Sequence, residues 1–195
     1  MDLLYDAARA WQRLLNYKYD ITCGKSKKLH KITLDFRADE FYHLAGFPHM
    51  GDIVFDIQGS RAKMLTHILE HAITEADISK SEGFEKFVKG KLTAIIHLEH
   101  LLNRCPQAFM FNPSKLPKHT YIKAKYLLVD NDARVIFLFT DSDENGQRNF
   151  SRSTFVMDNV DFRTNQSPIT VLQIKKINLA TGHTDILFRR EGFTE

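Results

Sequence analysis

Two histidines, His43 and His49, lie six residues apart where the pattern predicts the end of a short helix and the loop after it. Histidine can accept or donate a proton at neutral pH because its ordinary pKa lies near 7. Metal-free cleavage of RNA needs such a base and acid, and also a cation that stabilises the charged phosphorane. The two imidazoles could flank one phosphate if the loop folds back.

The cation could be Arg152, in a strand predicted over residues 147–157. Alternation along this strand places Arg152 and Thr154 on one face and Ser153 on the other. A second strand predicted over Thr120–Val129 carries lysines and a tyrosine on one face, so the two strands could form a basic, hydroxyl-bearing surface on which a base stacks. We therefore expect His43, His49, Arg152, Ser153 and Thr154 to be catalytic, and Lys28, Lys31, Tyr121, Lys123, Lys125 and Arg148 to bind nucleic acid. His183 is a further residue that could contact a base.

Each of these residues also has a structural interpretation. His43 could pack under the loop with its ring hydrogen-bonded, and Arg152 could pair with an acid across the sheet. The strand hydroxyls and the lysines could be ordinary surface groups. Gly46 and Asp52 are expected to be structural, Gly46 at the C-terminal end of the short helix and Asp52 as a hydrogen-bond acceptor.

Charge is unevenly distributed along the 195 residues, although the net charge is only +3. Six basic residues against two acids occur between Lys18 and Arg37, and four lysines without an acid occur between Ser114 and Tyr126. Two such stretches that converge in space would attract a polyanion. The alternative is that these lysines protect exposed strand edges from pairing.

Several classes of protein are disfavoured. The motifs of P-loop nucleotide hydrolases, dinucleotide-binding folds and α/β-hydrolases do not occur. No apolar run approaches the about 20 residues that span a bilayer, and the N-terminus does not read as a signal peptide, so we expect a cytoplasmic protein. The mixture of 43% hydrophobic and 26% charged residues indicates a folded chain.

The histidines and cysteines could in principle support metal or thiol chemistry. His67 and His71, and likewise His97 and His100, share helix faces, but the two pairs could meet only in one helical register, and no zinc-protease motif accompanies them. We expect no metal and no cofactor. Cys23 lies near two lysines that could lower its thiol pKa, although a lone strand cysteine more often packs in a core.

The hydrophobic patterning predicts one α+β domain over residues 1–195. Apolar residues recur at helical spacing over 2–16, and two β-rich runs around a Gly/Ser/Lys turn predict a hairpin over 17–36. Two longer helices are expected to form a helical hairpin over 60–104. Tight turns in the second half predict an antiparallel meander over 109–190. We expect the helices and hairpins to pack on a curved antiparallel sheet.

The segment from Leu34 to Ile53 resembles a small bacterial and phage family, a branch of the barnase–EndoU–colicin–RelE-like (BECR-type) nucleases. The matching positions are Phe41, His43, Leu44, Gly46, Phe47, Met50, Asp52 and Ile53. The segments Asn149–Phe155 and Leu172–Gly182 are similar to that family's closing strands. The resemblance runs from about residue 17 to 189, and it implies a metal-independent ribonuclease-like fold of phages, mobile elements and toxin systems.

Three functions therefore compete. The first is a metal-independent ribonuclease that acts on RNA and has an inhibitor as its partner. The second is a non-catalytic binding protein on the same scaffold, such as a phage protein that blocks a host defence component. The third is a metalloprotein built on the four helix histidines. The first predicts that His43, Arg152 and a hydroxyl or lysine meet in one cleft.

Overall fold

The computed structural model of the protein describes residues 2–53, 61–116, 120–130, 132, 134–143, 145–146 and 148–194. Helix α1 (Leu3–Leu14) begins at Asp2, whose side chain accepts a hydrogen bond from the backbone N–H of Tyr5. One face of α1 is buried, including Leu4, Trp11 and Leu14, as the helical spacing predicts. The indole of Trp11 donates a hydrogen bond to the carbonyl of Arg37, which fixes the chain just before α2 (Glu40–Leu44).

Strands β1 (Tyr17–Lys25) and β2 (Lys28–Leu34) form the predicted hairpin. Its two turn residues, Ser26 and Lys27, both have positive φ, as a two-residue turn between twisted strands requires. The remaining strands are β3 (Gln107–Met110), β4 (Tyr126–Asp130), β5 (Ile136–Ser142), β6 (Asn149–Val156), β7 (Ser167–Asn178) and β8 (Thr184–Arg189).

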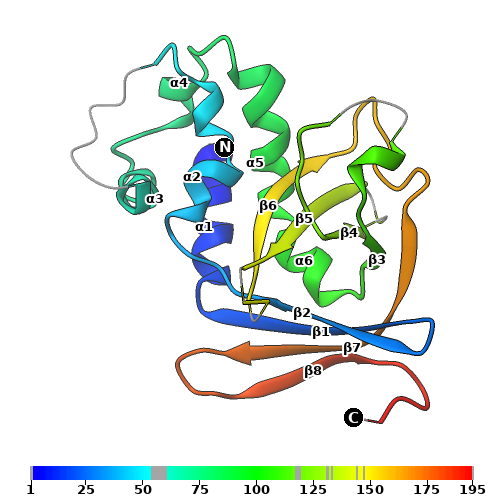
Figure 1. Cartoon of the computed structure of the whole chain (residues 1–195). Coiled ribbons are helices and arrows are strands. Elements are labelled where there is room, and N and C mark those ends of the chain that lie inside the picture. The colour runs from blue at the N-terminus through cyan, green and yellow to red at the C-terminus, as the bar shows by residue number, and fades with distance from the viewer. Residues whose placement is uncertain are drawn as a thin grey trace.

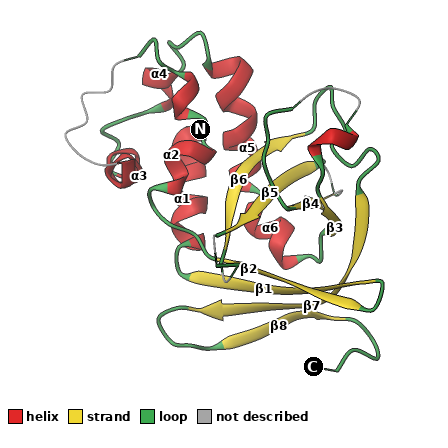
Figure 2. Cartoon of the chain, viewed as in Figure 1, coloured by secondary structure: helices red, strands yellow, loops and turns green. Residues whose placement is uncertain are grey.

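Among the described residues the strands pair in the order β1-β2-β6-β5-β4-β3-β7-β8, and β1 also pairs with β7. Seven strands therefore close into a ring, a β-barrel with β8 as an extra strand on β7 (Figure 1; Figure 2). The join between β2 and β6 is parallel and is registered at one residue pair, Leu34 and Asn149. It is reinforced by the Asn149 side chain, which accepts a hydrogen bond from the Thr33 N–H.

The α+β class is confirmed, but the curved antiparallel sheet is corrected to this closed barrel. Strands β3 to β6 follow chain order, as does the β7–β8 hairpin. After β6 the chain crosses the barrel, and the next strand, β7, pairs with β3. This twelve-residue strand also pairs with β1 and β8 along its length. Turn signals specify neighbouring strands, whereas pairings between distant segments leave no local pattern.

The predicted helical hairpin over 60–104 also differs from the structure, within its described part. Its first half contains α3 (Arg61–Leu69) and α4 (Glu75–Ile78), separated by the positive φ of His71 and the capping box of Thr74. Its second half is a π-helical turn η2 (Phe84–Val88) followed by α5 (Lys89–Ile96) and α6 (Leu98–Asn103). Helix α3 packs on α1 and α2, whereas α5 packs on α1 and β6.

The hydrophobic core has two parts, one on each face of β4 and β5. The larger part lies between the helices and the strands and includes Trp11, Leu128 and Leu138. The smaller part is on the opposite face, where Phe137 and Phe139 pack under the chain segments around Ile122 and Phe162. No described helix is long and apolar enough to cross a bilayer.

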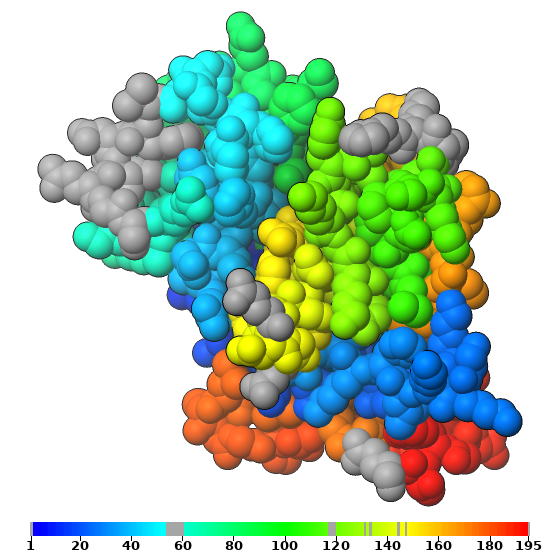
Figure 3. Space-filling model, in the orientation of Figure 1, coloured from blue at the N-terminus to red at the C-terminus, as the bar shows by residue number. Residues whose placement is uncertain are grey.

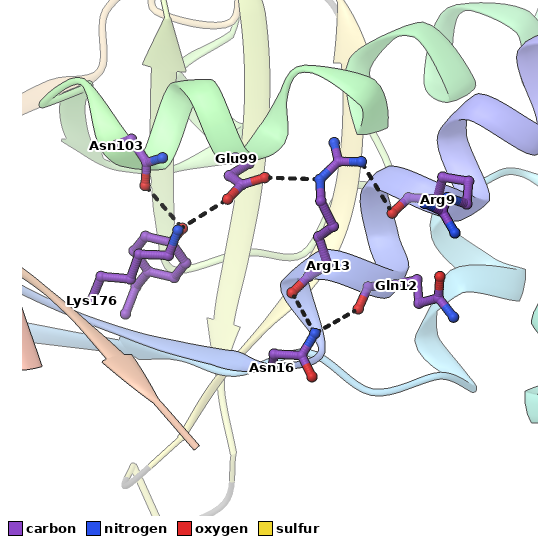
Figure 4. A network of polar contacts seen from close by, with 8 residues as sticks. Arg9, Gln12, Arg13, Asn16, Glu99, Asn103 and Lys176 are labelled. Carbon is purple, nitrogen blue, oxygen red and sulfur yellow. Dashed lines mark hydrogen bonds and ion pairs between the residues drawn. The ribbon is translucent and has the colours of Figure 1, made fainter. Parts of the chain in front are cut away.

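A polar network joins the helices to the barrel (Figure 4). Glu99 on α6 accepts hydrogen bonds from Lys176 on β7 at 3.0 Å and from Arg13 on α1 at 3.3 Å. The Lys176 ammonium also lies 4.0 Å from the ring centroid of Tyr17. Although burial opposes its charge, Lys176 and Arg13 hold the pKa of Glu99 below its ordinary value.

This network predicts a pH-dependent contribution to stability. Because the pKa of Glu99 is lower in the folded than in the unfolded state, its contribution is present above about pH 4.3 and is lost as the pH falls through the folded-state pKa. The loss in free energy of unfolding caused by Glu99→Gln should therefore shrink as the pH falls from 7. Urea unfolding of the wild type and the variant at several pH values measures this difference. Glu70→Gln is the control, because Glu70 is exposed. An unchanged difference at low pH would contradict the assignment.

Candidate active site

A pocket of about 470 Å³ opens where α5, β6 and the segment 120–123 meet. It is lined by His49, Lys91, Thr120, Tyr121, Ile122, Lys123, Arg152, Ser153 and Phe155. Five residues of the sequence prediction are among these: His49, Tyr121, Lys123, Arg152 and Ser153. In Figure 3 the segments around residues 40–50 and 120–125 lie next to one another on one face of the molecule, beside β6.

The loop after α2 folds back, as the sequence requires if His49 is to approach His43. Gly46 has φ of +90°, a left-handed conformation that ends α2 and suits glycine. It is followed by the short 3₁₀ helix η1 (Phe47–His49). The His49 ring then stacks on Phe87, with centroids 4.8 Å apart. The end of this loop is held by Asp52, which accepts hydrogen bonds from the Ser81 hydroxyl and the Glu82 N–H, the structural role expected for it.

Both histidines lie in a field of positive charge. Partial burial lowers the pKa of His43 below its ordinary value, and Arg61, Lys91 and Arg152 lower it further. The pKa of His49 is lowered by partial burial, by Lys91 and by His43 itself. The guanidinium of Arg61 lies 3.4 Å from Nε2 of His43. The free protein therefore favours neutral imidazoles at pH 7, the form that accepts a proton.

A β-bulge in β6 places Arg152 and Ser153 in the pocket together. Across the ladder Ser153 pairs with Phe139 and Ser151 pairs with Thr140, so Arg152 has no partner in β5. The extra residue resets the alternation of faces, and Ser151 and Thr154 are both buried. The prediction that Arg152 and Ser153 lie on opposite faces is therefore wrong. Strict alternation could not reveal the bulge.

Thr154 is not brought to the pocket. Its side chain is fully buried, and its hydroxyl donates a hydrogen bond of 2.8 Å to the carbonyl of Phe137. Arg152 is half exposed, with its Nε 3.6 Å from Oδ2 of Asp141 and its guanidinium over the ring of Phe150. Arg152 thus pairs with an acid across the sheet, as its structural interpretation expects, and it also lines the pocket. Its catalytic role stays a prediction.

The segment 120–125 keeps the predicted alternation without being a strand, since β4 begins only at Tyr126. Ile122 packs on the smaller core, while Tyr121 and Lys123 are exposed and line the pocket. Lys125 points elsewhere, with its Nζ 3.4 Å from the Ser142 hydroxyl, and does not line the pocket.

Three other predicted contacts lie outside the pocket. Lys28 and Lys31 belong to the β1–β2 hairpin, whose tip lies far from the segment 40–50 in Figure 3, and Lys31 pairs with Asp20. His183 lies in the β7–β8 turn and pairs with Asp185 at 3.1 Å. These positions follow from strand pairing and could not be read from charge alone.

Arg148 forms a clamp between β6 and α2 instead of a free cationic surface. Its guanidinium, 17% exposed, pairs with the carboxylates of Asp35 and Glu40. Burial opposes its charge, yet the hydrogen bonds that Arg148 donates to Glu40 and Asp35 raise its pKa above the ordinary value. Glu40 begins the helix that carries His43, so the clamp fixes that helix against the strand that carries Arg152.

Arg148→Met is expected to lower the free energy of unfolding by about 3 kcal/mol, because two largely buried carboxylates lose their cation. Urea unfolding at pH 7 measures the loss. Arg104→Met is the matched control, since the Arg104–Asp132 pair is exposed and should contribute less than about 1 kcal/mol. Equal losses in the two variants would contradict the role of Arg148 as a clamp.

Two residues of the site were missed from the sequence, Lys91 on α5 and Arg61 on α3. Lys91 lies on the apolar side of its helix, three residues after Val88 and four before Ile95. A lysine within an apolar stripe is unusual, and this is the signal that could have indicated it. Lys91 lines the pocket, and its positive charge acts on both histidines.

Within the described residues no group of three or more His, Cys, Asp or Glu side chains lies close enough to hold a metal ion. His71 stacks on Tyr5, whereas His100 pairs with Asp132. The two pairs of histidines therefore contact different parts of the molecule. Cys23 is fully buried in β1, and burial raises the pKa of its thiol to about 12. Its packing role is thereby favoured over reactivity.

Comparison with known proteins gives one match. No curated protein and no solved structure matches the chain significantly. A family model described as phage-Barnase-EndoU-ColicinE5/D-RelE like nuclease 4 (PBECR4) matches residues 3–191, nearly the whole chain and all of the pocket. This is the family group indicated by the segment around His43, and the chain belongs to the PBECR4 family of nuclease-like proteins.

Proposed function

We propose that this protein is a metal-independent endoribonuclease that cleaves RNA by attack of a ribose 2′-hydroxyl on the adjacent phosphate. The observation that supports the proposal is that His49, Arg152 and Lys91 line one pocket. His43 is not among the lining residues, but it lies close enough for Lys91 and Arg152 to lower its pKa. Two proton-transfer groups and a phosphate-binding guanidinium are the parts that this reaction requires.

In the proposed reaction one imidazole, in its neutral form, takes the proton of the 2′-hydroxyl while that oxygen forms a bond to phosphorus. The bond from phosphorus to the 5′-oxygen breaks, and the other imidazole, in its protonated form, gives its proton to that oxygen. The products are a 2′,3′-cyclic phosphate and a 5′-hydroxyl. Arg152 stabilises the negative charge of the phosphorane, Ser153 hydrogen-bonds a phosphate oxygen, and Lys123 and Tyr121 hold the adjoining nucleotide.

The family's description names phage and nuclease-like proteins, which supports a source in a phage or other mobile element. The site of the protein's toxin-like action on RNA would be the cytoplasm. A cytotoxic ribonuclease needs an inhibitor in the cell that makes it, so a protein that covers the pocket is the partner we propose.

The direct test is incubation of the purified protein with total RNA in EDTA. We expect cleavage by the wild type and by His183→Ala, whose histidine lies in the β7–β8 turn, and none by the double variant His43→Ala/His49→Ala. If a folded wild-type sample cleaves no RNA, with or without divalent metal ions, the non-catalytic binding protein replaces the ribonuclease as the proposed function.

A further inference from the structure

Lys91 is the least expected member of the pocket. It is half-buried, and this loss of water lowers the pKa of its ammonium group. Among the described residues no carboxylate pairs with it, in contrast to Lys89 on the same helix, which pairs with Glu85 at 2.9 Å. A cation that is partly desolvated and unpaired by protein lowers its free energy when an anion enters the pocket.

The backbone of the histidine segment is shaped around the stem of Lys91. A Cβ atom at Gly46 would lie 3.1 Å from Cδ of Lys91 and 3.0 Å from the carbonyl oxygen of Phe87. Glycine at this position therefore allows the loop between His43 and His49 to lie directly against the lysine. Packing of its stem therefore holds the lysine against the segment that carries both histidines, although its charge disfavours a second cation there.

We infer that Lys91 is a phosphate-binding residue of this site, and that its place beside His43 and His49 makes the binding of a phosphate group take up a proton. The inference rests on the proposed function and deepens it, because it names how the site obtains its general acid. Without a bound anion both imidazoles favour the neutral form at pH 7, so the site has a base and disfavours an acid. The phosphate offsets the charge of Lys91, and one imidazole then binds a proton.

Among the described residues, the charges around the two histidines come from three elements and from the segment 120–123. Arg61 on α3, Lys91 on α5 and Arg152 on β6 are positive, and Lys123 lines the same pocket. Among the residues that the structure describes, the acid paired with one of these cations is Asp141, which lies 3.6 Å from Arg152. The positive charges act together to disfavour an imidazolium, and an anion among them reverses that effect.

The test is an NMR titration of the histidine ring protons from about pH 4 to 8 with sulfate or chloride at equal ionic strength. Sulfate stands for the phosphate group because it remains a dianion over this range. In the wild type, sulfate should raise the pKa of His43 or His49, and calorimetry in buffers of different ionisation enthalpy should show proton uptake at about pH 6.

In Lys91→Met the pKa values of both histidines should rise without sulfate, and the Kd for sulfate should increase by about tenfold or more. Lys91→Arg should keep histidine pKa values and a Kd for sulfate close to those of the wild type. Lys89→Met, on the same helix, should match the wild type in both quantities. Wild-type sulfate affinity and histidine pKa values in Lys91→Met would overturn the inference.

If Lys91→Met does not fold, sulfate binding to the wild type without proton uptake also overturns the inference. The titration uses no RNA, so its outcome is separate from that of the cleavage assay. Sulfate-linked proton uptake without RNA cleavage would contradict the ribonuclease and leave the anion site standing. Cleavage without proton uptake would contradict the role of Lys91 alone.

Discussion

Replacing His43 or His49 by alanine is expected to lower kcat/KM for RNA cleavage by about 10² to 10⁴-fold, the usual contribution of a positioned acid or base. The expectation follows from the loop that Gly46 turns back, which brings His49 into the same positive field as His43. Because base and acid act in one step, the double variant should lose far less than the product of the two single losses.

Initial rates on a fluorescent RNA at several pH values measure both effects. The control is His183→Ala, which removes an exposed histidine from the β7–β8 turn and should retain wild-type kcat/KM. Circular dichroism establishes that each variant is folded. An activity within about threefold of the wild type for both single variants would contradict acid–base roles for these histidines, since a change this small is only about 0.6 kcal/mol of transition-state stabilisation.

Arg152→Met should lower kcat by about 10² to 10³-fold, the cost of removing one group that stabilises transition-state charge. The bulge at Arg152 turns its guanidinium to the same side as Ser153, and Asp141 holds it there at 3.6 Å. Met keeps much of the length of the side chain over the Phe150 ring, so the variant tests charge more than packing. Arg152→Lys should recover part of the loss, because lysine retains the charge and lacks the planar fork.

Lys125→Met is the matched control for Arg152→Met. Lys125 is an exposed cation on the neighbouring segment, and it does not line the pocket. Its removal should change only KM, by a small factor that vanishes at high salt, because a distant surface charge acts through the screened field. Equal losses of kcat in Arg152→Met and Lys125→Met would mean that both residues act only through the overall positive field. That result would contradict a specific role of Arg152 in the transition state.

Local structure could be predicted where one sequence segment fixes it. The stripe of α1 and the hairpin turn within the Gly/Ser/Lys run depend on neighbouring residues, and both occur as expected. The segment around His43 was sufficient to indicate the family. The alternation of Ile122 with Tyr121 and Lys123 was also informative, although this segment is not a strand.

Features that depend on distant segments could not be predicted. The pairing of β1 with β7 closes the barrel across more than a hundred residues, and no turn signal marks it. Arg148 directly precedes the strand that carries Arg152 and has the same charge, yet the acids Asp35 and Glu40 convert it into a clamp. Lys91 enters the site only because α5 packs on β6, and its place within an apolar stripe does not indicate which site it joins.

The most direct test of the central claim is the chemistry of the ends that the protein produces from RNA in EDTA. The account predicts 2′,3′-cyclic phosphate and 5′-hydroxyl ends from the wild type, with the same substrate left intact by the His43→Ala/His49→Ala variant. Products with 3′-hydroxyl and 5′-phosphate ends, or cleavage of an all-deoxy strand, would contradict it, because neither outcome involves a 2′-hydroxyl as the nucleophile.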